Sequence, residues 1–425
     1  MSEIRYSRRA FVQLSASVTA TLLIACRDTT GSTGAADSGL DAPDVPVTVN
    51  KPPWVTLLGP GAARLRLESR DAQAVTVFIT IADTSPMAHT PVLSETELTY
   101  SWADVDGLDV LADQEGLHVL QDVLLEGLPE DAVVSWRVNA GDGVIHEGRF
   151  RTSPGNDATI TLGWIADTMH PFSAGPIATM AATMAAVGID LIIHGGDIQY
   201  QSSPVDTWNG FFDAIAPLAA QAPLHLLVGN HEFESQDEIA VMYERLAAPQ
   251  GDGASPRYFA FRYGSILFIC LDTETGDLSD PTSPQRTWLS QTLSQDDDHR
   301  YTIVCMHRPS FTFSKHWRSD PTLRDALHAE FLTHGVDLVL AGHAHCYERF
   351  MVDGLPYVVD GGGGALTYDP DEGMTELEAV RPDEISLRQV ADRSYGVTFV
   401  QASPDGLTVW RIDEDGVETD RFNAD

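Results

Sequence analysis

Short apolar runs alternate with helical patterns from about residue 158 onward, and this alternation limits the possible folds more than any other feature. Runs such as TITLGWIA (159–166) and LIIH (191–194) have the length and composition of buried strands. Segments such as PIATMAATMAAVG and TWNGFFDAIAPLAA, which stand between such runs, have the apolar spacing of helices. Alternation of this kind is typical of layered α/β domains. We therefore predict an α/β domain over residues 155–425.

Residues 52–154 have a different sequence pattern, in which apolar and polar residues alternate with a period of two. The runs RLRLE (64–68) and VVSWRV (133–138) alternate in this way, and AVTVFITI (74–81) is rich in β-branched residues. Several short strands separated by turn residues predict a small β-sandwich. The stretch LLEGLPEDAVVSWRV resembles a fibronectin type III module. We expect this domain to act as a spacer or to shape access for a substrate.

The first 26 residues have the pattern of an export signal, with Arg8 and Arg9 before an apolar run that is too short to span a bilayer. The string SRRAFV resembles a twin-arginine signal. LIAC, which ends at Cys26, resembles a lipoprotein processing box, and an ordinary cleaved signal is the alternative. Residues 27–51 are expected to form a flexible linker. These features predict an exported periplasmic or cell-surface lipoprotein of a bacterium, which meets the membrane only through its lipid anchor.

The charge balance is strongly acidic, since 62 Asp and Glu residues outnumber 26 Lys and Arg residues and give a net charge of −36. A nucleic-acid partner is not expected, because it would require a basic surface. The overall field also opposes an anionic substrate. A site for anions on this chain would need positive charge of its own, such as metal ions.

Metal-capable side chains follow five of the apolar runs in the predicted α/β domain. Ligands of α/β sheets bind at the carboxyl ends of the strands, so these side chains are expected to meet. They suit a hard cation, which prefers oxygen and imidazole donors. The residues concerned are Asp167, Asp197 with Tyr200, Asn230 with His231 and Glu232, His307, and His343 with His345.

The spacing of these residues indicates two ions rather than one. Asp197 is central and has two carboxylate oxygens with which to bridge neighbouring ions. His343 and His345 alternate along an extended segment, so that each can reach a different ion. Two cations about 3.5–4 Å apart form a clamp for in-line displacement at phosphorus.

The blocks GGDIQY, GNHE, CMHRPSF and GHAHCYER resemble the motifs of the calcineurin-like metallophosphoesterases. The tyrosine after the second Asp and the GHxHxYER form are similar to those of purple acid phosphatases. The resemblance covers about residues 52–412. It implies a four-layer αββα domain, with two mixed sheets flanked by helices, behind an N-terminal β-sandwich.

Carried to this sequence, the resemblance implies two metal sites that share Asp197. The first is typically occupied by Fe(III), and the second by Fe(II), Zn or Mn. A Tyr200 phenolate on Fe(III) would give a visible colour. His231 would face the phosphate, as would His316, for which an exposed loop position is the alternative. The implied ligands are Asp167, Asp197, Tyr200 and His345 for the first site, and Asp197, Asn230, His307 and His343 for the second.

One block departs from the family pattern, because ADTMH stands where GDxG is expected. Met169 is a poor ligand for a hard ion. Tyr200 can take the coordination position that a histidine occupies in the wider superfamily. We expect His170 to lie behind the ligands or to be structural. We also expect Tyr347, Glu348 and Arg349 to brace their loop, and leave open a contact between Arg308 and phosphate.

The resulting hypothesis is hydrolysis of a phosphate ester of the acid phosphatase type, in which a metal-bound hydroxide attacks phosphorus. His231 and His316 would stabilise developing charge or protonate the leaving oxygen. A phosphodiesterase or nucleotide-cleaving hydrolase on the same site is one alternative. A tethered binding protein without turnover is another. Substrate identity, the second metal and the oligomeric state stay open.

Overall fold

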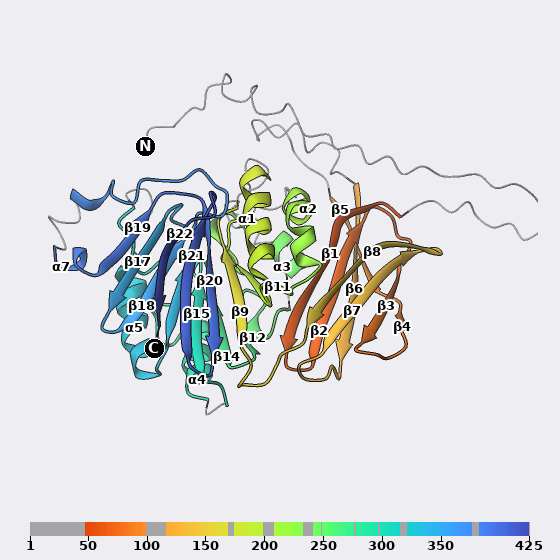
Figure 1. Cartoon of the computed structure of the whole chain (residues 1–425), viewed down its shortest axis with the longest axis horizontal. Helices are drawn as coiled ribbons and strands as arrows, with labels where there is room; N and C mark the ends of the chain where they lie inside the picture. The colour runs from red at the N-terminus through yellow and green to blue at the C-terminus, as the bar shows by residue number, and fades with distance from the viewer. Residues whose placement is uncertain are drawn as a thin grey trace, which may run out of the picture. The chain divides into compact units, whose positions relative to one another are not determined.

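Strands dominate the N-terminal part of this computed structural model, and helices flank two larger sheets in the remainder (Figure 1). The described residues belong to one unit, Val45–Asp425. The structure describes residues 47–98, 116–168, 174–198, 208–232, 241–247, 249–275, 278–295, 298–314, 321–375 and 382–424.

The N-terminal β-rich part consists of two antiparallel sheets of four strands, with the orders β1-β2-β6-β5 and β4-β3-β7-β8. This is the strand order of immunoglobulin-like sandwiches. The narrower fibronectin type III assignment stays a prediction. The strands are β1 (Val49–Gly59), β2 (Ala62–Ser69), β3 (Thr76–Ile81), β4 (Met87–His89), β5 (Val92–Leu98), β6 (Gly116–Glu126), β7 (Val133–Ala140) and β8 (Gly143–Arg151).

Two mixed sheets form the second part of the chain. The six-stranded sheet has the order β11-β10-β9-β20-β21-β22, and the eight-stranded sheet has the order β12-β13-β14-β15-β16-β18-β17-β19. The strands are β9 (Ile160–Ile165), β10 (Leu191–His194), β11 (Leu224–Leu226), β12 (Asp252–Ser255), β13 (Tyr258–Tyr263), β14 (Ile266–Leu271), β15 (Tyr301–Met306), β16 (Leu338–Ala341), β17 (Tyr347–Val352), β18 (Leu355–Asp360), β19 (Arg388–Asp392), β20 (Gly396–Ser403), β21 (Gly406–Asp413) and β22 (Glu418–Asn423).

The helices lie on the outer faces of these sheets. Met184 of α1 packs with Ile192 of the six-stranded sheet, and Leu327 of α5 packs with Val339 of the eight-stranded sheet. The inner faces meet each other, as Trp164 and Cys305 share one core. The order is therefore helix, sheet, sheet, helix. The helices are α1 (Ala174–Val187), α2 (Trp208–Ala219), α3 (Val241–Ala247), α4 (Pro284–Leu293), α5 (Pro321–Thr333) and α7 (Pro382–Ile385), with a 3-10 turn, η3, at Asn230–Glu232.

The sandwich packs directly on the α/β part. Figure 1 shows α2 between α1 and strand β1, and the rings of Trp54 and Phe212 are 4.4 Å apart between centroids. Thr56 donates a hydrogen bond of 3.1 Å to the Leu224 carbonyl, and the Arg149 amide donates one of 2.7 Å to Ala220. The α/β layers and the N-terminal strands confirm the predicted fold class.

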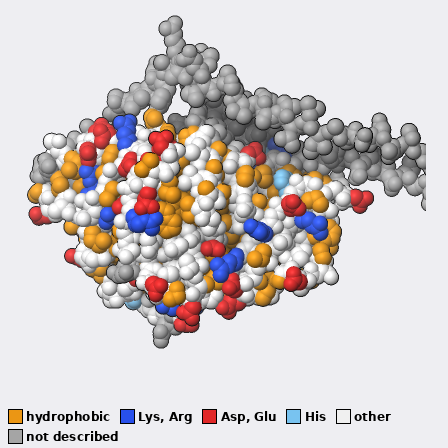
Figure 2. Space-filling view, in the orientation of Figure 1, with side chains coloured by type: hydrophobic (Ala, Val, Ile, Leu, Met, Phe, Trp, Pro, Cys, Tyr) orange, Lys and Arg blue, Asp and Glu red, His pale blue; other side chains and the backbone are white. Residues whose placement is uncertain are grey.

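Two surface properties bear on partners. On the face shown in Figure 2, Lys and Arg side chains are scattered among acidic ones rather than gathered in one patch. Within the described part of the chain, no helix combines the length and the apolar character needed to cross a bilayer.

Candidate metal centre

The carboxyl ends of strands from both sheets meet at one place. Strands β9 and β10 are parallel neighbours, as are β15 and β16 in the other sheet. The pairing of β9 with β10 continues past the strands, since the Asp167 amide donates to Gly196 over 3.0 Å. In the same way the Gly342 amide, beyond β16, donates to His307 over 3.0 Å. The side chains that follow these four strands therefore lie at one edge of the domain.

Three of the candidate ligands sit in the left-handed backbone region, with φ of 58° at Asp167, 55° at Asp197 and 68° at His343. This region is uncommon for residues other than glycine and costs on the order of 1 kcal/mol or more. All three residues stand just after a strand, two residues after the ends of β9 and β16 and three after the end of β10. Strain of this kind is concentrated at functional sites.

Glycines allow the backbone to approach the candidate ligands closely. A Cβ on Gly229 would lie 2.3 Å from Asp197 Oδ1. A Cβ on Gly361 would lie 2.3 Å from the Ala344 carbonyl and 2.8 Å from Asp167 Oδ2. Both positions therefore exclude any side chain, which explains the glycines in GNHE and at the start of GGGG.

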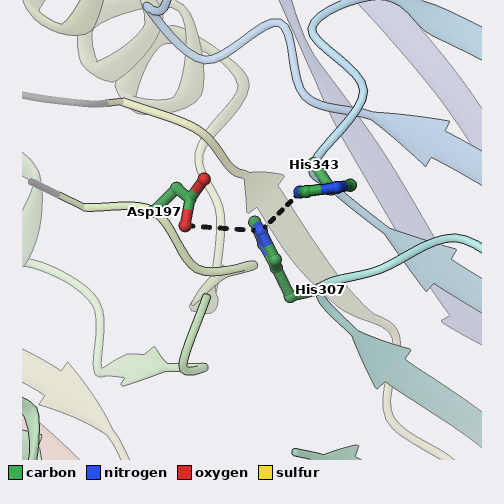
Figure 3. Close-up of side chains that lie close together, drawn as sticks. All are labelled: Asp197, His307 and His343. Atoms are coloured by element: carbon green, nitrogen blue, oxygen red, sulfur yellow. Dashed lines mark hydrogen bonds and ion pairs between the residues drawn. The ribbon is translucent and has the colours of Figure 1, made fainter. Parts of the chain in front are cut away.

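Asp197, His307 and His343 form the closest group, with one potential ligand atom of each within 4.8 Å of the others (Figure 3). His307 Nε2 is 3.3 Å from Asp197 Oδ1 and 3.1 Å from Asn230 Oδ1. His343 Nδ1 is 3.1 Å from the same His307 nitrogen. The opposite nitrogen, His307 Nδ1, donates to the Gly195 carbonyl over 2.9 Å. A backbone carbonyl thus holds the outer N–H and directs the inner nitrogen at oxygen acceptors, which is the arrangement of metal-ligating histidines.

His345 repeats this arrangement beside Asp167. Its Nδ1 donates to the Leu366 carbonyl over 3.0 Å, and its Nε2 lies 3.5 Å from Asp167 Oδ1. The imidazole is stacked on the ring of Tyr368, with 4.6 Å between centroids. Asp167 is fully buried, and its Oδ2 accepts from the His343 amide over 2.7 Å. Its Oδ1 has no hydrogen-bond partner among the described residues.

A bound cation would balance the charges of this group. Burial alone would lower the pKa of His307, but Asp197 outweighs it and raises that pKa to about 10. Burial would raise the pKa of Asp197, but His307 and His231 outweigh it and hold that pKa well below its ordinary value. Burial raises the pKa of Asp167, an effect that His345 and His307 oppose only in part. A positive charge among these groups is therefore favoured, and oxygen and imidazole donors suit a hard metal ion.

Comparison with known proteins agrees with this geometry. Residues 160–347 match the family model described as calcineurin-like phosphoesterase. These residues form a calcineurin-like phosphoesterase domain. Phosphoenolpyruvate phosphatase of Allium cepa is 27% identical over 260 residues, which are 56% of this chain and 52% of the relative. Purple acid phosphatase 18 of Arabidopsis thaliana is 30% identical over 241 residues, which are 53% of this chain and 54% of the relative.

The likeness extends to the fold outside the matched domain. A purple acid phosphatase, PPD1, from yellow lupin seeds superposes with a TM-score of 0.70 at 18% identity, covering 87% of this chain and 73% of the other. A structure of PhoD gives a TM-score of 0.57 and covers 88% and 91%. The chain spans about half the length of the curated relatives it matches.

The phosphoesterase domain brings together six of the predicted site residues as close neighbours. His231 lies at the edge, where its amide donates to Asp197 Oδ1 over 2.9 Å and its Nε2 is 3.8 Å from Oδ2. Tyr200, His316 and His170 lie outside the described residues, so their positions stay predictions. The six neighbours are Asp167, Asp197, Asn230, His307, His343 and His345.

Glu232, which the sequence analysis named only as a metal-capable side chain, holds the backbone of the site. The buried carboxylate accepts from the amides of Asp197 over 3.1 Å, Ile198 over 3.0 Å and Gly229 over 2.7 Å. It therefore ties the turn after β10 to the turn after β11. Burial and the Asp197 charge raise the pKa of Glu232 to about 7. In the sequence, its position in the GNHE block was the one feature that could have indicated this role.

The YER residues brace their surroundings, as expected. Glu348 is buried and accepts from the Phe313 amide over 3.0 Å, which holds the segment just before residues 315–320. Tyr347 donates to Asp420 Oδ2 over 2.7 Å, and Arg349 donates to the same oxygen over 2.6 Å. These contacts fasten β17 to β22 of the other sheet.

Proposed function

We propose that the phosphoesterase domain hydrolyses phosphate esters with two bound metal ions, in the manner of an acid phosphatase. The supporting observation is the repeated geometry of His307 and His345, each held by a backbone carbonyl and aimed at a buried carboxylate. The names of the relatives, which include several purple acid phosphatases, favour the same reaction.

We propose that Asp197 bridges the two ions. Asp167, Tyr200 and His345 would complete one site, and Asn230, His307 and His343 the other. Fe(III) in the first site, with Fe(II), Zn or Mn in the second, is the assignment to be tested. Bound cations of this kind supply a positive clamp for phosphoryl oxygens and acidify a coordinated water.

The residues of the chain itself would orient the ester. His231 sits beside Asp197 and is partly exposed, so its ring can donate a hydrogen bond to an oxygen of the substrate. His316 is proposed for the leaving-group side. With a net charge of −36, the chain needs the local positive charge of the centre to hold an anion.

The decisive experiment is metal analysis of the purified chain together with its visible spectrum and its turnover of 4-nitrophenyl phosphate. We expect about two metal ions per chain, a violet colour that Tyr200→Phe abolishes, and hydrolysis that a chelator stops. A colourless protein with no bound metal and no turnover would overturn the proposal.

A non-catalytic role is the second candidate. One relative is named "Probable inactive purple acid phosphatase 9", from Arabidopsis thaliana, and is 28% identical over 195 residues. A further structure with the same fold is described as the anchor in the inner membrane complex of Plasmodium, with a TM-score of 0.51. Metal content without turnover of either mono- or diesters would favour this candidate.

We propose that the chain is exported and lipid-anchored through Cys26. The twin-arginine-like and lipoprotein-like strings support this proposal. Mass spectrometry of the N-terminal peptide from cells tests it. A diacylglyceryl group on Cys26 is expected, and an uncleaved or unmodified N-terminus would contradict it.

A further inference from the structure

Arg308 stands beside the candidate metal centre without being one of its ligands. It directly follows His307, and 34% of its side chain is exposed, whereas Glu274 beside it is 6% exposed. Arg308 Nε and Nη2 donate to Glu274 Oε2 over 3.0 and 2.8 Å. The backbone is held as well, since the Arg308 amide donates to Thr273 Oγ1 over 3.1 Å. The segment after β14 therefore fixes this guanidinium in place.

Arg308 contacts the candidate metal centre through His343. Arg308 Nη1 is 3.0 Å from His343 Nε2, and the other ring nitrogen, Nδ1, faces His307 over 3.1 Å. A guanidinium has five N–H donors, and the contacts above engage three of them. Two further N–H groups have no partner among the described residues and remain for an acceptor from solution.

We propose that Arg308, positioned by Glu274, binds a terminal phosphate oxygen of the substrate and makes the site selective for monoesters over diesters. This inference rests on the proposed function. A monoester has three terminal oxygens and up to two charges, whereas a diester has two terminal oxygens and one charge. If the two cations engage two oxygens, only a monoester keeps a third for Arg308. Guanidinium groups match phosphate oxygens in geometry and charge.

The first test compares Arg308→Ala, Arg308→Lys and wild type as metal-loaded full chains. Arg308→Ala is expected to lower kcat/KM for 4-nitrophenyl phosphate about ten- to a hundredfold, the usual worth of a charge-assisted hydrogen bond. The kcat/KM for bis(4-nitrophenyl) phosphate should change much less, and Arg308→Lys should recover part of the loss. Arg421→Ala is the matched control, because it also breaks an Arg–Glu pair, with Glu418, on exposed β22.

Glu274→Gln tests the positioning role. It should raise KM for the monoester more than it lowers kcat. Combined with Arg308→Ala it should add little, because Glu274 acts through Arg308. Independent, additive losses would show that Glu274 acts in some other way.

Binding of inorganic phosphate gives a readout apart from turnover. Inorganic phosphate should raise the melting temperature of the metal-loaded wild type more than dimethyl phosphate does, and Arg308→Ala should remove the difference. Unchanged phosphate binding, or equal losses for both esters, would overturn the role of Arg308. If the wild-type chain cleaved neither ester, the proposed function would be refuted instead. The phosphate-binding measurement would still test whether Arg308 binds phosphate.

Discussion

Two groups of buried ionisable side chains can be compared, one where the sandwich meets α3 and one at the candidate metal centre. In the first, the junction cluster, the single carboxylate of Glu68 forms ion pairs with Lys51 and with Arg245 of α3. His118 Nδ1 lies 2.9 Å from Glu68, and Asn50 Nδ2 donates to it over 2.7 Å. Protein donors thus surround this carboxylate.

At the candidate metal centre, by contrast, the carboxylates are not fully surrounded by protein donors. Its two carboxylates, Asp167 and Asp197, face imidazole nitrogens, and Asp167 Oδ1 has no hydrogen-bond partner in the described part of the chain. Three of its residues also adopt the left-handed backbone region. A buried carboxylate surrounded by its own cations has its charge balanced, whereas one that keeps an unpartnered oxygen costs stability until a ligand supplies the missing charge.

The largest expected effect is on turnover when the shared carboxylate of the centre is removed. Asp197→Ala should abolish binding of both metals and lower kcat by about a thousandfold or more, as for residues that act as one catalytic unit. Metal analysis and 4-nitrophenyl phosphate assays measure this. Glu68→Gln is the comparison and should keep its metal. Full metal content and turnover in Asp197→Ala would refute the bridging role.

Breaking the junction cluster should instead affect stability. Glu68→Ala leaves the charges of Lys51 and Arg245 buried without their partner, so the free energy of unfolding should fall by about 3–5 kcal/mol. Urea denaturation of the metal-loaded chain measures the change. Glu418→Ala on exposed β22 is the control and should change it by about 0.5 kcal/mol or less. Similar values for both variants would mean that the junction cluster contributes no more than a surface pair.

Removal of metal should destabilise the centre but leave the junction cluster untouched. A cation at a hundred times its Kd adds about 2.7 kcal/mol to the free energy of unfolding. Melting curves with and without a chelator should therefore differ for wild type and by the same amount for Glu68→Gln. Coincident curves for wild type would indicate that the centre binds no cation.

The smallest expected effect is the pH dependence of the junction cluster. Burial raises the pKa of Glu68, but Lys51, His118 and Arg245 outweigh it and hold that pKa below its ordinary value. A lowered folded pKa adds stability above the unfolded value, about 4.3, and that stability is lost as the pH falls further.

Comparison of wild type with Glu68→Gln measures this contribution. Below pH 4.3 the free energy of unfolding of wild type should fall more steeply, by up to about 1.4 kcal/mol per pH unit. Parallel pH profiles for the two proteins would mean that Glu68 titrates in the folded chain as it does in the unfolded one.

The strands that end in candidate ligands were all predicted from sequence, but several others were missed. Strands β12, β13, β17, β19, β21 and β22 were not identified, and they lie toward the edges of the two sheets. Strands β19 and β22 are half exposed and carry no continuous apolar run, whereas β13 is largely buried and was missed in spite of that. These strands are recognised only in the folded chain, where they pair with the neighbouring strands of their sheets.

Sequence alone sufficed for the layered α/β fold and for the residue types of the centre. Apolar runs of strand length must be buried, and the polar residues after parallel strands must emerge at one edge. Both inferences depend only on residues that are close together in the sequence, so the local sequence pattern is enough to make them.

Tertiary structure decided which atoms face one another. The contact of His343 with Asp167 joins residues 176 positions apart, and that of Arg308 with His343 joins residues 35 apart on two strand ends. The partnerships of Glu68 and Glu274 also depend on contacts between segments distant in sequence. Hydrogen bonds and ion pairs need atoms within about 3–4 Å, and only the folded chain sets distances on that scale.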